Sequence, residues 1–267
     1  MDLVSYRPPP SVGAGLLGLL ALYVLCVGPY RTRFVGSAVV PRARQVAFMS
    51  GLLVMLIALA TPLDTIGDQY LFTAHMLQHL LLTLIAPPLL LAGTPAWLLR
   101  YLLAATRLSD FVHWARHPIV AFFTFNLVFS LAHVPAFYEL TLSNEALHAL
   151  EHMVFVGTAM LMWMPVLSPA PDIAVRYPAL GQVLYLFLLT VPASLVGALL
   201  ASTGSAYYPT YISAPRITSL SPLEDQQLGG LIMWVGSGLY FLIASGVVFF
   251  VWASREEAAN RRPLGVH

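Results

Sequence analysis

Two pairs of histidines in this sequence are spaced four residues apart within strongly apolar stretches. The first pair, His75 and His79, lies in Leu-Phe-Thr-Ala-His-Met-Leu-Gln-His, and the second, His148 and His152, lies in His-Ala-Leu-Glu-His. Four residues are about one turn of an α-helix, so each pair occupies one face of a helix. An imidazole facing lipid would leave its nitrogens unpaired at a cost of roughly several kcal/mol, so both faces must point into the protein.

Imidazoles gathered in an apolar interior indicate a metal site. The sequence has a single cysteine, Cys26, so the ligands within one chain must be nitrogen, oxygen or thioether. We predict one metal site whose ligands are His75, His79, His133, His148 and His152. Side chains expected to support these ligands, or to take part in ion transfer, are Asp64, Met76, Glu151, Met153, Asp225 and Met233.

Several of these residues also have simpler interpretations. A single intramembrane histidine can be a hydrogen-bond partner between helices, and methionines more often pack than bind metal. On their own, Asp64 and Asp68 are better explained as solvated loop or capping residues than as ligands or an entry funnel for cations. The sequence also contains a third pair with the same spacing, His113 and His117, beside Arg116. We expect that pair to be interfacial, with no ligand role.

The composition is that of a membrane protein. Apolar residues make up 58% of the chain and charged residues 9%, where ordinary globular proteins have about 25% charged residues. The mean hydropathy is +0.78. The formal charge is only +1 and no basic stripe is present in the sequence, so a nucleic-acid partner is not expected.

Apolar runs of about 20 residues are long enough to cross a bilayer. The sequence predicts an all-α membrane protein with seven transmembrane helices in a single helical-bundle domain over residues 1–267. The predicted spans are residues 11–27, 45–60, 69–91, 118–134, 146–167, 179–201 and 227–253. A short amphipathic interfacial helix is expected over 96–114, between the third and fourth spans. Pro87 and Pro88 are expected to break or kink the third span.

Arginine placement predicts the orientation of these spans. Eleven of the 13 arginines fall on one side of the topology, and only Arg7 and Arg216 fall on the other. The excess of positive charge marks the cytoplasmic side, so the N-terminus is expected outside and the C-terminus inside. With this orientation of the spans, the five candidate histidines all lie in the outer layer of the membrane.

Several sequence blocks in fixed order carry a family resemblance. They are Thr61-Pro-Leu-Asp64, Leu71-Phe-Thr-Ala-His-Met-Leu-Gln-His79, Ala86-Pro-Pro-Leu-Leu90, Gly93-Thr-Pro95, His148-Ala-Leu-Glu-His152 and Asp225-Gln-Gln-Leu-Gly-Gly230. Over residues 40–255 the chain resembles the multi-span cytochrome c oxidase assembly factor family called CtaG. This family differs from the single-span, cysteine-using copper chaperone that shares the name. Ala132 stands before His133 where many members have an aromatic residue, a departure that concerns packing.

The resemblance implies a metallochaperone of the bacterial inner (plasma) membrane, and not an enzyme. Its expected cargo is copper, as Cu(I) or Cu(II), with zinc as the alternative metal. Its expected role is to help deliver copper to the CuB centre in subunit I of a haem–copper cytochrome c oxidase. Further expected partners are a periplasmic copper donor and the lipid bilayer, with an oligomer possible. The histidine motifs of the family match His75, His79, His148 and His152, and His133 follows as a fifth ligand on the periplasmic side.

Two alternatives remain open at this stage. A zinc-dependent seven-span intramembrane hydrolase, similar in outline to ceramidases, would need three ligands, an open position for water and a base such as Glu151 or Asp64. The sequence lacks the serine–aspartate–histidine pattern of that family. A membrane cytochrome would ligate haem from opposite sides, which makes poor use of histidines paired on one helix.

Overall fold

The computed structural model describes residues 10–106, 109–115, 117–170 and 177–261, and every regular element within them is helical. The α-helices are α1 Pro10–Val27, α2 Arg42–Leu59, α3 Pro62–Gln69, α4 Phe72–Leu80, α5 Ala86–Gly93, α6 Ala96–Thr106, α7 Ser109–Ala115, α8 Pro118–Ala132, α9 Pro135–Leu142, α10 Glu145–Leu167, α11 Ala179–Ser202, α12 Pro209–Ser213, α13 Pro222–Leu231 and α14 Ser237–Asn260. Two π-helical segments, η3 Leu81–Ile85 and η4 Ile232–Gly236, join α4 to α5 and α13 to α14. A short 3₁₀ turn, η2, covers Arg31–Arg33.

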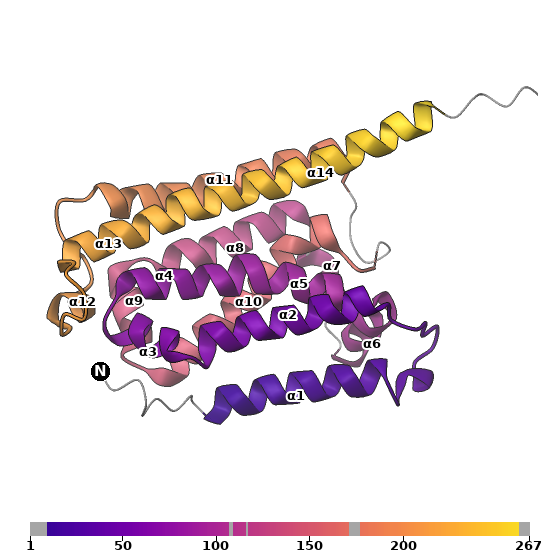
Figure 1. Cartoon of the computed structure of the whole chain (residues 1–267), viewed down its shortest axis with the longest axis horizontal. Helices are drawn as coiled ribbons and strands as arrows, with labels where there is room; N and C mark the ends of the chain where they lie inside the picture. The colour runs from indigo at the N-terminus through magenta and orange to yellow at the C-terminus, as the bar shows by residue number, and fades with distance from the viewer. Residues whose placement is uncertain (1–9, 107–108, 116, 171–176, 262–267) are drawn as a thin grey trace, which may run out of the picture.

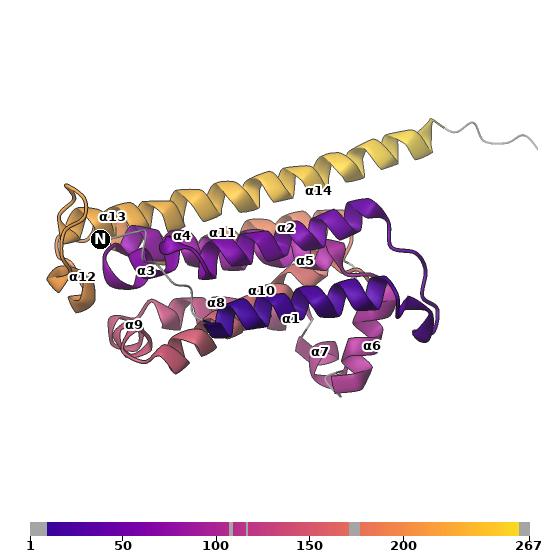
Figure 2. The same ribbon diagram turned by 60° about the horizontal axis from the view of Figure 1, so that its bottom comes forward.

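The long helices run roughly along one axis, and the short ones gather at the two ends (Figures 1 and 2). Helices α3, α9 and α12 lie at one end, and α6 and α7 lie at the other. The apolar runs favour helices in lipid because a helix satisfies its backbone hydrogen bonds internally. The described chain is therefore a helical bundle with distinct ends, as expected of a multi-pass membrane protein.

Six of the helical stretches are long and apolar enough to cross a membrane, or seven if the bent pair of α8 and α9 counts as one span. The predicted fourth span, 118–134, corresponds to α8, which has only 15 residues. At 1.5 Å per residue α8 reaches about 22 Å, short of the roughly 30 Å of hydrocarbon. The chain then turns by 78° into α9. Pro135 explains the turn, because the residue before a proline avoids helical geometry and Val134 is extended.

The predicted third span is one helix of 22 residues, Phe72–Gly93, that passes through the two prolines without ending. Pro87 has no N–H to donate to the carbonyl of Thr83, and its ring would crowd that carbonyl in a regular helix. The π-helical η3 widens the turn just before the prolines. The free Thr83 carbonyl accepts a hydrogen bond from the indole N–H of Trp163 at 3.1 Å. The predicted break at the prolines is therefore absorbed by the π segment and a neighbouring side chain.

Other boundaries also differ from the sequence expectation. The predicted interfacial helix is split into α6 and α7, with residues 107–108 outside the described chain. The last span runs from Pro222 to Asn260 and not over 227–253. Its start is fixed by a capping box between Ser221 and Glu224, and its charged end continues because Arg, Glu and Ala are good helix formers. Helices α3, α9 and α12 were not predicted.

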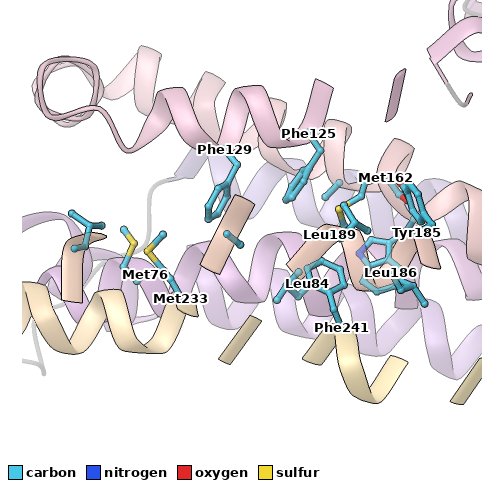
Figure 3. Packing of buried hydrophobic residues seen from close by; sticks show 14 of the residues in the cluster. Met76, Leu84, Phe125, Phe129, Met162, Tyr185, Leu186, Leu189, Met233 and Phe241 are labelled. Atoms are coloured by element: carbon cyan, nitrogen blue, oxygen red, sulfur yellow. The ribbon is translucent and has the colours of Figure 1, made fainter. Parts of the chain in front are cut away.

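The buried apolar core lies among α4, α5, α8, α10, α11 and α14 (Figure 3). Figure 3 shows Met76 and Met233 at the same end of this cluster, away from Tyr185 and Leu186. Close approach between α11 and the last span depends on two facing glycines. A Cβ on Gly197 would lie 2.6 Å from the Trp234 backbone nitrogen, and one on Gly230 would lie 2.7 Å from the Ala201 nitrogen. Small residues at such crossings allow helix backbones to pack closely within a membrane.

The close packing of α11 against the last span predicts that a glycine-to-alanine substitution has different effects on stability at Gly157 and at Gly197. In Gly157→Ala the new Cβ meets nothing within 4 Å, so the variant should be as stable as the parent or up to about 1 kcal/mol more stable. Gly197→Ala should be destabilised by about 1–3 kcal/mol, because the new methyl group collides with backbone atoms that cannot rotate away. Thermal unfolding of both purified variants in one detergent is the measurement. Equal stability of the two variants would contradict the close crossing.

Candidate metal centre

The five predicted histidines converge at the end of the bundle that carries α3 and α9. His75 and His79 lie on α4, His148 and His152 lie on α10, and His133 lies between α8 and α9. His148 is slightly exposed, and the other four are buried. The predicted grouping at one depth is therefore present in the structure.

The distances between ring centres show how the rings are grouped. The two rings of each helical pair are close together, at 4.2 Å for His75 and His79 and 4.3 Å for His148 and His152. Rings on different elements are further apart, at 5.4 Å for His75 and His148, 5.6 Å for His79 and His152, and 6.1 Å for His79 and His133. The cluster is thus continuous from His148 to His133.

Asp68 joins this cluster, which the sequence did not predict. One of its oxygens, Oδ1, lies 3.2 Å from His75 Nδ1 and 3.1 Å from His148 Nε2. One ligand atom from each of these three residues falls within 4.8 Å of the others, a spacing that can hold a metal ion. The Asp68 side chain is 24% exposed, so this part of the cluster is open to the surroundings. The expectation of a solvated loop residue is wrong, because Asp68 lies on helix α3.

Gly67 explains how Asp68 reaches the cluster. A Cβ on Gly67 would lie 3.0 Å from both the backbone nitrogen and the Cα of His75, so α3 packs directly against the start of α4. The carbonyl of Gly67 accepts a hydrogen bond from the Tyr211 hydroxyl at 2.7 Å. The sequence signal for helix α3 was the Thr61-Pro62 pair, since Thr61 caps α3 and Pro62 stands in its first turn.

Both nitrogens of His148 face carboxylate oxygens. Nε2 faces Asp68 as above, and Nδ1 lies 3.3 Å from Glu151 Oε2. A neutral imidazole has only one N–H, so two carboxylate partners fit the doubly protonated ring. A metal ion bound at Nε2 would take the place of that proton, so binding there releases a proton. Glu151 stands where the sequence predicts an acceptor that orients a ligand.

Several buried imidazole nitrogens have no hydrogen-bond partner. They are Nε2 of His75, both nitrogens of His79 and Nε2 of His152. Buried polar atoms are paired in the great majority of cases, because an unpaired one costs roughly 1–3 kcal/mol. Unpaired lone pairs that converge from two helices fit a metal ion as their shared partner. Nitrogen and oxygen donors of this kind suit copper and zinc.

Two aspartates of α3 have different electrostatic states. Burial, together with the neighbouring Asp68 charge, raises the pKa of Asp64 to about 6. Burial also acts to raise the pKa of Asp68, but contacts with His148 and His75 outweigh it and hold the value well below the usual range. Asp68 is therefore the charged partner of the histidines. Asp64 accepts a hydrogen bond from Gln78 at 2.7 Å and so ties α3 to α4.

Two of the predicted supporting residues have other roles. Met153 is 65% exposed and points away from the cluster. Asp225 accepts hydrogen bonds from the backbone nitrogens of Phe72 and Thr73 at 2.7 and 3.1 Å, so its carboxylate caps the start of α4. Asp225 is thus a positioning residue for the helix that carries His75 and His79, and not a ligand. The expected role of Met153 in support or transfer stays a prediction, whereas Asp225 supports the ligands through the backbone of α4.

Met76 and Met233 lie where the histidine cluster meets the buried apolar core, as expected of side chains that support the ligands. Met76 Sδ lies 3.3 Å from His133 Nε2, and Met76 is fully buried. Met233 is buried in the same apolar cluster as Met76 (Figure 3). Met76 therefore offers a thioether directly to one of the histidines.

A group of tyrosines, which the sequence did not indicate, supports the outer end of the cluster. The hydroxyls of Tyr138 and Tyr211 lie 2.7 Å apart, and the Tyr208 hydroxyl donates to the His133 carbonyl at 2.9 Å. The ring of Tyr138 lies 5.1 Å from that of His75. These bonds tie α9 and α12 to α3 and to His133, so the short helices hold the histidines in place.

Comparison with known proteins agrees with this architecture. A protein of Mycobacterium leprae (strain TN), described as Uncharacterized protein ML1998, is 26% identical over 269 residues, which cover 94% of this chain and 40% of that protein. The chain thus spans about two fifths of the length of this curated relative. No solved structure matches the chain. The family model of the cytochrome c oxidase caa3 assembly factor (Caa3_CtaG) matches residues 21–255, which include the whole histidine cluster, and the chain therefore belongs to this family.

Proposed function

We propose that this protein binds copper at the histidine cluster and passes it to the CuB centre of a haem–copper oxidase during assembly. The observation that carries the proposal is the trio of Asp68, His75 and His148, whose ligand atoms lie within 4.8 Å, backed by buried histidines with unpaired nitrogens. Membership of an oxidase assembly family supplies the acceptor. Copper is the cargo in this scheme and not a resident cofactor.

The donor set suits an ion that must be handed on. A closed thiolate shell would hold copper tightly, whereas imidazole, carboxylate and thioether ligands can exchange one at a time. The outer ligands are partly exposed at Asp68 and His148, so a periplasmic copper donor can approach them. A lateral encounter with subunit I within the membrane then allows release without passage through the bilayer.

The charges of the described chain support a periplasmic position for the cluster. Arginines lie in η2 and in helices α2, α6 and α14, toward the end of the bundle opposite α3, α9 and α12 (Figure 1). At the cluster end, Arg216 follows α12. The positive end is expected in the cytoplasm, which places the N-terminus of the chain outside. The proposed location is the bacterial inner membrane, which this charge distribution and an oxidase partner support.

A zinc-dependent hydrolase is the second candidate, because the same trio resembles a three-ligand zinc site with a nearby carboxylate. Asp68, His75 and His148 would hold the ion, and Glu151 would act as the base for an attacking water. The assembly-factor family favours the non-enzymatic role. Stoichiometric zinc together with hydrolysis of lipid amides by the purified protein would favour the enzyme.

Substitution of the outer ligands tests the proposed function directly. His75→Ala and Asp68→Asn should lower bound copper in the purified protein, because the first removes one of three neighbouring donors and the second replaces a charged carboxylate by a weaker, neutral amide oxygen. In a strain that lacks the gene, the same variants should fail to restore the copper content of the oxidase. His117→Ala is the matched control, since that residue is exposed and lies at the other end of α8. Normal CuB content in the strain without any copy of the gene would remove the proposed function.

Labelling of introduced cysteines tests the proposed orientation of the chain in the membrane. In a Cys26→Ala background, a cysteine at Ser219 should react with a membrane-impermeant maleimide applied to intact spheroplasts. A cysteine at Thr32 should react only after permeabilisation, because it lies in the arginine-rich connection between α1 and α2. Both positions are exposed, so accessibility of the side chain itself is matched. The reverse labelling pattern would put the cluster in the cytoplasm and exclude delivery from the periplasm.

A further inference from the structure

The side chain of His133 makes an unusual contact on the inner side of the cluster. Its Nδ1 lies 2.6 Å from the carbonyl oxygen of Phe129, which can only accept, so Nδ1 carries the ring proton. In a neutral ring Nε2 is then an acceptor, and it faces Met76 Sδ at 3.3 Å. A thioether has no proton to donate. Two lone-pair atoms therefore face each other in a buried position, and a soft cation bound to both satisfies both.

The ring spacings show which histidines can share an ion with this pair. A metal–imidazole bond is about 2.0–2.1 Å long, so two rings that bind one ion have centres about 5–6.5 Å apart. His79 lies in this range from both His133, at 6.1 Å, and His152, at 5.6 Å. The pairs on one helix, at 4.2 and 4.3 Å, lie below this range. His79 therefore groups with His133, and His75 groups with Asp68 and His148.

The inner group differs from the outer one in its chemistry and surroundings. The outer group has a carboxylate, two imidazoles and partial exposure at Asp68. The inner group has imidazoles and a thioether, with the rings of Phe129 and Phe155 packed against His133 and His79. Both nitrogens of His79 and Nε2 of His152 are buried without a partner. Thioether and imidazole ligands in a dry interior favour Cu(I) over divalent ions.

We infer that the protein has a second, inner metal site, formed by His79, His133 and Met76, that is selective for Cu(I). As the inner station of a transfer path, it rests on the copper-handling function proposed above. His75 and His152 connect the two sites, with ring centres 6.5 Å apart, so an ion supplied as Cu(I) can move inward by ligand exchange. The copper keeps its oxidation state throughout, and each step replaces one bound donor by another.

The test is an anaerobic titration of the purified full chain with Cu(I), in competition with a chromophoric Cu(I) chelator. The parent protein should bind two Cu(I) ions per chain, and Met76→Leu should bind one. Titration with Zn²⁺ probes the outer site and should give the same stoichiometry for the parent and Met76→Leu. Met164→Leu is the matched control, because Met164 is buried in the same apolar cluster but far along α10 from the histidines. It should bind two ions.

X-ray absorption of the Cu(I)-loaded protein supplies a second readout that needs no variant. A sulfur scatterer on copper should be present in the parent and in Met164→Leu, and absent in Met76→Leu. A single Cu(I) with only nitrogen and oxygen neighbours, lost entirely in Asp68→Asn and unchanged in Met76→Leu, would overturn the inner site and leave the proposed function intact. Failure of the parent to bind copper in any form would overturn both.

Discussion

A neutral imidazole in an apolar interior needs a partner for each of its nitrogens, and this requirement shapes the end of the bundle that holds the histidines. Asp68 supplies one partner to His75 and His148, and the Phe129 carbonyl supplies another to His133. Four further nitrogens, on His75, His79 and His152, are buried without a hydrogen-bond partner, and the centres of these three rings lie within 6.5 Å of one another. Neither packing nor hydrogen bonding within the described chain accounts for them. In the proposed function, an ion that accepts several lone pairs is the shared partner of these nitrogens.

The short helices hold these rings in position. Helix α3 packs on α4 through Gly67, and Asp225 on α13 fixes the first turn of α4 across 153 residues of sequence. Tyr208 and Tyr211 link α12 to His133 and to α3. Beyond the cluster, η3 lets α4 and α5 run on as one span despite two prolines. Positioning therefore comes from several separate elements, so no single helix determines the site.

The sequence predicted what depends on local pattern and missed what depends on tertiary contact. Apolar runs and histidine spacing were enough to place four of the five rings on two buried helices. Helix α3 was missed because eight residues with Pro62 and Gly67 resemble a loop, and Asp68 was misassigned with it. Met153 was expected near the ion because it follows His152, but adjacent helical residues point about 100° apart. Asp225 caps α4 from a distant part of the chain, so no local sequence pattern indicates this contact.

The proposed outer and inner groups differ in their ligands. This difference offers a physical reason why one chain carries more histidines than one ion needs. An ion that is to be handed on must never be held by a complete, closed shell, because the last ligands would then leave slowly. In the proposed scheme His75 belongs to the open, oxygen-containing group and His79 to the buried, thioether-containing group, so the ion meets an incomplete set of ligands at each step. The short separation within each pair then becomes useful, because leaving one ring brings the ion within reach of the next. Such a path would end at Met76 and His133, which are in contact and both buried.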